Sequence, residues 1–226
     1  MSSPSEKLPL GLMVPPVPAG VEIPPEPPDV GGRALSVTAR MLCGATTFFF
    51  LAFLFAYFYL RSINSSGRWK GSGYHAPQIG YGVAILALVL VSAVVQYVGL
   101  QRIKAGAKGA WQVTALVALL LGLAAVALQI VQLLTLPFQP GSSGFSSVFT
   151  DTYPALLVSW LGAMIWLEIL LMRVRPLTSI SFLEQPPTYA EAFAVQRFQS
   201  SLSAFTLIWN FMALVTLFFF LLFYVL

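Results

Sequence analysis

A run of mostly apolar residues from position 41 to position 60 constrains this chain more than any other feature of its sequence. As an α-helix, which rises about 1.5 Å per residue, it would match the hydrocarbon core of a bilayer, which is about 30 Å thick. Aromatic side chains crowd this run, and Arg61 closes it. Such a helix has no polar face for water, so its surroundings must be lipid or other apolar helices.

Four further apolar runs of similar length follow, with polar or basic turns between them. The five predicted spans are 41–60, 79–100, 110–136, 153–172 and 202–226. Charged residues make up only 9% of the chain, whereas soluble domains carry roughly 25%. The sequence therefore predicts an all-α membrane protein, a bundle of five transmembrane helices, over residues 36–226.

Residues 1–35 are predicted to form a proline-rich N-terminal tail. Nine prolines fall within the first thirty residues, and proline removes a backbone donor and breaks helices. We expect an extended or disordered cytoplasmic tail, with docking on a partner as the alternative. Residues 1–30 carry one base and four acids, a net charge of −3, whereas the rest carries eleven bases and four acids, a net charge of +7.

Local signals predict how the last two spans begin. Pro154 stands just inside the expected start of the fourth span, where Thr150, Asp151 or Thr152 would cap the helix. Ahead of the fifth span, residues 176–201 are amphipathic rather than apolar throughout. This pattern predicts a separate interfacial helix that joins the fifth span at a cluster of serines near position 201.

Basic residues predict the orientation of the bundle, because cytoplasmic loops are enriched in lysine and arginine. With the N-terminus inside, nine bases are cytoplasmic and three are external. The cytoplasmic nine are Lys7, Arg33, Arg40, Arg102, Lys104, Lys108, Arg173, Arg175 and Arg197, and the external three are Arg61, Arg68 and Lys70. We expect a multi-pass protein of a bacterial plasma membrane, with its N-terminus cytoplasmic and its C-terminus external. The sequence contains no basic cluster with interleaved aromatic residues, so we do not expect nucleic acid as a partner.

The supply of metal-ligating side chains is small. The chain has one cysteine, Cys43, and one histidine, His75. Haem, copper and zinc sites usually take two or more imidazole or thiolate ligands. We therefore expect this chain to bind no cofactor and no metal itself. The sequence also contains no catalytic triad, phosphate-binding loop or carboxylate pair, so no catalytic residue is predicted.

Polar side chains within the predicted spans are the candidates for a functional site. The possible lipid or helix contacts are Thr46, Gln129, Gln132, Ser159, Glu168 and Asn210. Gln129 and Gln132 share a helix face, where they would hydrogen-bond across helices or bind a lipid headgroup. Glu168 is the only carboxylate in any span. It would either pair with Arg173 at the inner boundary or relay protons.

Small residues one helical turn apart predict where helices pack closely. These pairs and triplets are Ala52 and Ala56, Gly80 and Ala84, Ala118 and Gly122, and Ala155, Ser159 and Ala163. The spacing is common by chance in alanine-rich spans. It therefore predicts a bundle without specifying which helices are neighbours.

Four stretches of this sequence resemble subunit III of the haem–copper oxidases, the cytochrome c and quinol oxidase family. ATTFFFLAFLFAYFYLR (45–61) is similar to the family's span with paired phenylalanines and an Ala-Tyr-Phe end. LGLAAVALQIVQ (121–132) resembles its span ending in Gln-x-x-Glu, and SSVFTDTYPALLVSWLG (146–162) its His-Gly-x-His-Val segment. WNFMALVTLFFFLLFYV (209–225) stands where the family has Trp-His-Phe-Val-Asp before an aromatic run.

Most of the family's characteristic polar residues are replaced in this sequence. Two glutamates, three histidines and one aspartate of the family correspond, in that order, to Thr46, Gln132, Ala155, Val158, Asn210 and Ala213. The apolar frame, the order of the stretches and their spacing agree with the five-span form of subunit III. The resemblance therefore implies a divergent member of this family.

The resemblance implies an accessory, non-catalytic subunit of aerobic respiration that stabilises catalytic subunit I and its proton-uptake region through helix and lipid packing. It implies subunit I, subunit II and membrane phospholipid as partners, with haem and copper held by the partner subunits. A small secondary transporter and a subunit III paralogue serving another complex are the alternatives. The sequence lacks the paired half-repeats and intramembrane charges that favour a transporter.

Overall fold

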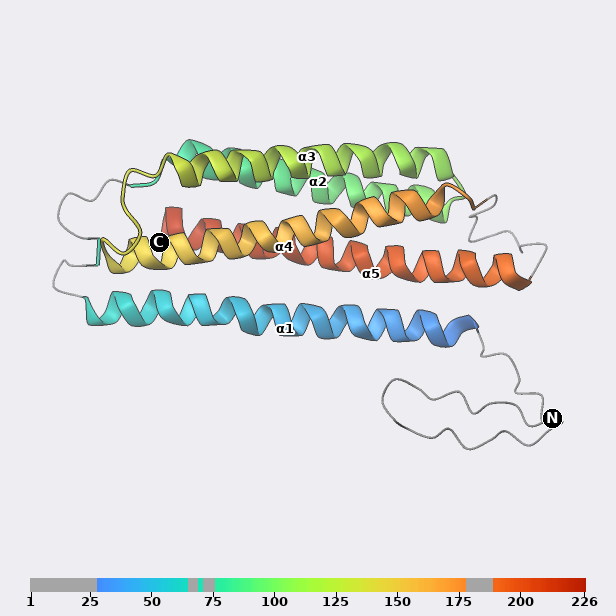
Figure 1. The fold of residues 1–226 in the computed structure, drawn as a ribbon, viewed down its shortest axis with the longest axis horizontal. Coiled ribbons are helices and arrows are strands. Elements are labelled where there is room, and N and C mark those ends of the chain that lie inside the picture. Colours follow the sequence, from blue (N-terminus) through green and yellow to red (C-terminus); the bar gives the residue numbers. More distant parts are fainter. Residues whose placement is uncertain (1–27, 65–68, 71–75, 178–188) are drawn as a thin grey trace, which may run out of the picture.

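The computed structural model describes residues 28–64, 69–70, 76–177 and 189–226, with side chains from residue 33 in the first helix and from residue 194 in the last. The predicted tail up to residue 27, His75 and residues 178–188 lie outside the described residues. The described part of the chain is helical, without strands (Figure 1). Its elements are α1 (Pro28–Ile63), α2 (Ile79–Lys104), α3 (Lys108–Leu134), α4 (Gly144–Val174), α5 (Tyr189–Phe220) and a terminal π-helical turn, η1 (Leu221–Val225). Five helices are each long and apolar enough to cross a bilayer, so the predicted all-α membrane fold is confirmed.

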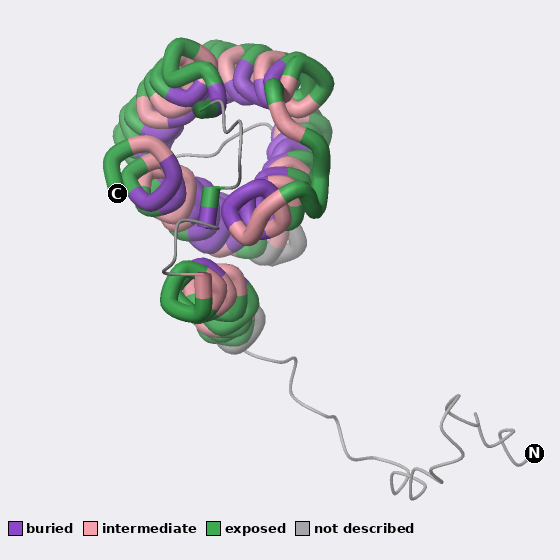
Figure 2. Tube along the Cα trace, turned by 90° about the vertical axis from the view of Figure 1, so that its left-hand side faces the viewer, coloured by how far each residue is buried: buried purple, intermediate pink, exposed green. Residues whose placement is uncertain are grey.

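Four of the helices form a ring, and the fifth packs on its outside. α2 contacts α3 and α5, and α4 contacts the same two helices, which closes a ring of α2, α3, α4 and α5. α1 contacts α4 and α5 only at the outer side of this ring (Figure 2). The first span is therefore the most peripheral element, and only 11% of its most apolar window is buried.

Large aromatic side chains fill the ring interior, whereas those of α1 mostly face outward. Trp111, Phe149 and Trp209 are completely buried. By contrast, Phe48 and Phe55 of α1 are 78% and 70% exposed. Because lipid tails solvate aromatic side chains as well as a protein interior does, this outward face suits a hydrocarbon environment.

Glycines mark places where helices approach each other closely. A Cβ added at Gly99 of α2 would lie 2.5 Å from Oγ1 of Thr114 in α3, and one at Gly122 of α3 would lie 2.9 Å from Cε of Met164 in α4. Gly122 belongs to a predicted small-residue pair, which is thus a true helix contact. The predicted contact at Gly80 is wrong, because Gly80 is exposed and nothing lies within 4 Å of an added Cβ.

The first helix begins earlier than its sequence indicates. α1 starts at Pro28, so the tail boundary predicted at residue 35 is wrong. Proline is unfavourable inside a helix but well suited to its first position, where the missing N–H has no helical partner. Pro28 is the last of the nine N-terminal prolines, and the helix therefore forms as soon as the prolines end.

The fourth helix also begins earlier, and a different residue caps it. Ser143 Oγ accepts a hydrogen bond of 3.1 Å from the backbone N–H of Ser146, and Ser146 Oγ accepts one of 2.8 Å from the backbone N–H of Ser143. This reciprocal pair is a capping box with serine in place of glutamate. The predicted caps at positions 150–152 are wrong because the helix runs through Pro154, which membrane helices tolerate when neighbouring groups satisfy the freed backbone.

The predicted interfacial helix is not a separate element. α5 is one continuous helix from Tyr189 to Phe220, and the serines near position 201 do not interrupt it. Val195 and Phe198 in its first part are buried, at 7% and 5% exposure. The amphipathic pattern therefore reflects packing of this segment on the bundle rather than on a membrane surface.

Candidate functional site

Two of the predicted site residues, Thr46 and Ser159, border the same hollow. This hollow has a volume of about 270 Å³ and lies between α1, α4 and α5. Ser159 Oγ donates a hydrogen bond of 2.8 Å to the carbonyl oxygen of Ala155, so its polarity is satisfied within its own helix. Trp166 and Met212 are among the mostly apolar side chains that complete the walls.

A second hollow follows the contact between α1 and α5. It has a volume of about 320 Å³, and Phe50, Leu54 and Phe218 are among its lining residues. Its one polar side chain, Thr47, donates a hydrogen bond of 2.8 Å to the carbonyl oxygen of Cys43. Phe211 lines both hollows. Neither contains a charged side chain, so their chemistry suits a hydrocarbon chain rather than a polar substrate.

The two predicted glutamines lie inside the ring. Gln129 and Gln132 are 4% and 2% exposed. Gln129 Nε2 donates a hydrogen bond of 2.8 Å to the carbonyl oxygen of Tyr153 on α4, and Gln132 Nε2 donates to the hydroxyl of Tyr224 in η1. Of the two roles considered, cross-helix hydrogen bonding is the one that the structure contains.

Sequence reasoning missed the two tyrosines that complete this polar cluster. The hydroxyl groups of Tyr153 and Tyr224 interact with each other, so the cluster connects α3, α4 and the end of the chain. A buried tyrosine usually places its hydroxyl against a polar partner. Their position in apolar spans was therefore a usable signal that the search for polar side chains overlooked.

Glu168 and Asn210 belong to neither hollow. Glu168 is exposed on α4, and no ion pair joins it to Arg173 in the part of the chain that the structure describes. α4 has 31 residues, a length of about 46 Å, which exceeds a bilayer core of about 30 Å. In a centred helix Glu168 falls near one edge of that core, within reach of interfacial water. Asn210 is half-buried on α5, between Trp209 and Phe211.

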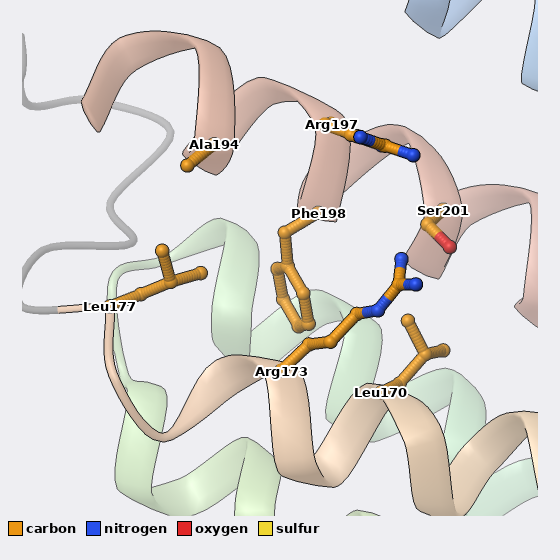
Figure 3. A pocket seen from close by; sticks show the side chains of 7 residues that line it. All are labelled: Leu170, Arg173, Leu177, Ala194, Arg197, Phe198 and Ser201. Carbon is orange, nitrogen blue, oxygen red and sulfur yellow. The ribbon is translucent and has the colours of Figure 1, made fainter. Parts of the chain in front are cut away.

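Two arginines define a third hollow, between the end of α4 and the start of α5. It has a volume of about 300 Å³, and Arg173, Arg197 and Ser201 line it together with apolar side chains that include Phe198. Figure 3 shows both guanidinium groups on the same side of the hollow, close to Ser201. Ser201 and Phe198 are buried, whereas both arginines are exposed. No carboxylate is among the described residues that line this hollow.

Hydrogen bonds from Lys108 connect the start of α3 to the segment after α4 that forms one wall of this hollow. Lys108 Nζ, at the start of α3, donates to the carbonyl oxygens of Arg175 and Leu177, at 3.2 Å for Arg175. Leu177 lines the hollow.

In the sequence, Arg173 and Arg197 served only to predict orientation. Their convergence arises because α4 ends and α5 begins at the same end of the bundle (Figure 1).

No group of three or more His, Cys, Asp and Glu side chains comes together in the described part of the chain. No protein-family model matches this sequence, and no curated protein does either.

Proposed function

We propose that this chain is a cofactor-free accessory subunit of a haem–copper terminal oxidase, which stabilises the catalytic subunit by helix packing and by holding membrane phospholipid. The resemblance of four stretches to subunit III, in the same order, supports the choice of complex. Haem and copper belong to the partner subunits I and II in this proposal.

One observation carries the lipid-holding role. Residues 159–166 of α4 line an apolar hollow, and residues 170–173 of the same helix line the arginine hollow. The two hollows thus follow each other along α4 and α5. A phospholipid has the same order of chemistry, a hydrocarbon chain followed by a phosphate, and two guanidinium groups offer charge-assisted hydrogen bonds to that phosphate.

Purification of the chain from its native membrane tests the choice of complex. A tagged full-length chain is expected to co-purify with a haem-containing subunit I and a copper-containing subunit II, visible as a Soret band and as stoichiometric copper. The chain expressed alone is expected to show neither signal. Co-purification with a different membrane complex would instead identify a paralogue, and recovery without partners would support a transporter.

We further propose a cytoplasmic N-terminus and an external C-terminus, on the basis of nine bases against three. In a Cys43→Ser background, Gln139→Cys is expected to react with a membrane-impermeant thiol reagent on intact cells, because Gln139 is exposed between α3 and α4. Ser3→Cys is expected to react only after lysis. The reverse labelling pattern would invert the proposed topology.

Removal of the two arginine charges tests the phosphate contact. An exposed base near an anionic membrane surface contributes about 1 kcal/mol, so Arg173→Gln with Arg197→Gln is expected to weaken retention of anionic phospholipid about tenfold or more. Retained lipid is measured by native mass spectrometry after detergent exchange. Arg102→Gln with Lys104→Gln is the matched control, because both side chains are exposed at the same end of the bundle and line none of the hollows described above.

Equal lipid loss in the two double variants would show a general charge effect rather than a site. Competition with inorganic phosphate distinguishes a phospholipid headgroup from a soluble anion as the group that binds the two arginines. A headgroup anchored by its chains is expected to resist free phosphate at millimolar concentration, whereas displacement would identify a soluble anion as the occupant.

A further inference from the structure

The ring of α2, α3, α4 and α5 contains more buried polar atoms than protein groups alone satisfy. Among the described residues, the buried side-chain atoms without a hydrogen-bond partner are Nε2 and Oε1 of Gln96, Nε1 of Trp111, Oε1 of Gln132 and Nε1 of Trp209. Buried polar groups in proteins are nearly always hydrogen-bonded, either to protein or to ordered water. Ordered water would satisfy these groups, but none of their residues lines the small cavity described next, which has polar groups of its own.

One position within the ring has both the space and the chemistry for a water molecule. A cavity of about 10 Å³ lies where all four ring helices meet, and Gly82, Gln129, Tyr153 and Thr216 are among its lining residues. A single ordered water needs a cavity of about 10–15 Å³ and two to four polar partners. The cavity is close to this minimum size, so it has room for one water and for nothing larger.

The existing hydrogen bonds leave acceptors free at this cavity. Gln129 uses its Nε2 to donate to the carbonyl oxygen of Tyr153 at 2.8 Å, and its carbonyl oxygen has two lone pairs for further donors. The hydroxyl of Thr216 donates to the carbonyl oxygen of Met212 at 2.9 Å and accepts from Nε1 of Trp160 at 3.0 Å. One lone pair of that hydroxyl oxygen remains, so the two hydrogens of a water have one acceptor on α3 and one on α5.

We propose that an ordered water molecule resides in this cavity and donates to Gln129 Oε1 on α3 and to Thr216 Oγ1 on α5. The Tyr153 side chain of α4 forms the third polar wall. The water thereby links helices that are not neighbours in the ring, since α3 and α5 lie on opposite sides of it. This inference is independent of the proposed oxidase function and rests only on the cavity and its hydrogen-bonding groups.

An experimental structure of the full chain in lipid, at a resolution that shows ordered water, tests the proposal directly. A density peak is expected within hydrogen-bonding distance of both Gln129 Oε1 and Thr216 Oγ1. An empty cavity at that resolution, with neighbouring waters visible, would overturn the proposal.

Variants on α5 test which groups hold the water. Thr216→Val keeps the shape of the side chain but removes the hydroxyl, so the peak is expected to disappear or to lose most of its occupancy. Thr206→Val is the matched control, because Thr206 is another threonine of α5, donates to the carbonyl oxygen of Leu202 at 2.9 Å as Thr216 does to that of Met212, and does not line the cavity. The control is expected to keep the peak at full occupancy. Retention of the peak in Thr216→Val would overturn the assigned bond to α5.

Thr216→Val also removes the acceptor of Trp160, so its structure has to show the indole of Trp160 in its wild-type position before the loss is assigned to the water. If the indole moves, Gln129→Met provides the second variant, since it removes the acceptor on α3 and leaves Thr216 and Trp160 intact. A peak that persists in Gln129→Met would contradict the proposal.

Discussion

Replacement of Gly99 by leucine is expected to separate α2 from α3 and to lower the free energy of unfolding by about 1–3 kcal/mol, the usual cost of overpacking. A Cβ at this position would lie 2.5 Å from Oγ1 and 3.3 Å from Cβ of Thr114. Thr114 cannot easily rotate away, because a β-branched side chain in a helix has few χ1 rotamers and its hydroxyl already donates to the carbonyl oxygens of Ala110 and Trp111. The backbones themselves would therefore have to move apart.

The same substitution at Gly80 provides the control. Gly80 lies on α2 as well, but it is exposed and nothing lies within 4 Å of an added Cβ. Gly80→Leu is expected to leave the thermal unfolding midpoint in detergent nearly unchanged, whereas Gly99→Leu lowers it by several degrees. Equal effects of the two variants would contradict the packing of α2 against α3, and would point to a general intolerance of bulk in this helix.

The five helices were predictable because each apolar run is about 20 residues or longer, the length that an α-helix needs to cross a bilayer core. Periodicity did not reveal which side of each helix is buried, since lipid-facing and interior residues are both apolar. Gly80 and Gly99 illustrate this point, because the sequence around each is similarly apolar and only the structure separates the exposed glycine from the buried one.

Helix ends were predicted less well, for identifiable physical reasons. The first helix starts at the last N-terminal proline, and the fourth starts at Gly144, after a capping box in which serine stands in place of glutamate as the second partner. A proline at the first helical position and a capping box made of serines are both weak sequence signals. The run of prolines and the Thr-Asp-Thr cluster are stronger patterns, and they predicted later starts for these two helices. The amphipathic start of α5 has the composition of a surface helix, but its apolar side is buried against the bundle.

The candidate site was predictable only where a polar residue stands alone in an apolar span. Gln129 and Gln132 were found in this way, and Thr46 and Ser159 were found without any sign that they share a hollow. Arg173 and Arg197 are 24 positions apart and lie at helix ends, where bases are common. Their convergence depends on the packing of α4 against α5, which no local pattern in the sequence specifies.

Trp209→Ala is expected to destabilise the isolated chain by about 3–5 kcal/mol, the range for truncating a fully buried large aromatic side chain. Trp209 is completely buried, and its ring centroid lies 5.0 Å from that of Trp160 on α4 and 5.3 Å from that of Phe205. Its removal leaves a cavity beside Gly122 of α3, which has no side chain of its own to fill it. Thermal unfolding in detergent measures the loss in the isolated chain.

In the oxidase complex that we propose, the same variant distinguishes a packing role from a proton-transfer role. Trp209→Ala is expected to reduce the amount of this chain that remains bound after purification and, with it, the stability of oxygen consumption during turnover. Glu168→Gln keeps the shape of the side chain and removes only its charge. Because Glu168 is exposed on α4 and makes no ion pair with Arg173 among the described residues, this variant is expected to leave both retention and turnover nearly unchanged. Thr46, Gln132 and Asn210 cannot titrate near neutral pH, so Glu168 is the only candidate proton carrier within the predicted spans. A severe loss of turnover in Glu168→Gln, with the chain still fully bound, would therefore reject the packing account and assign this carboxylate to a proton path.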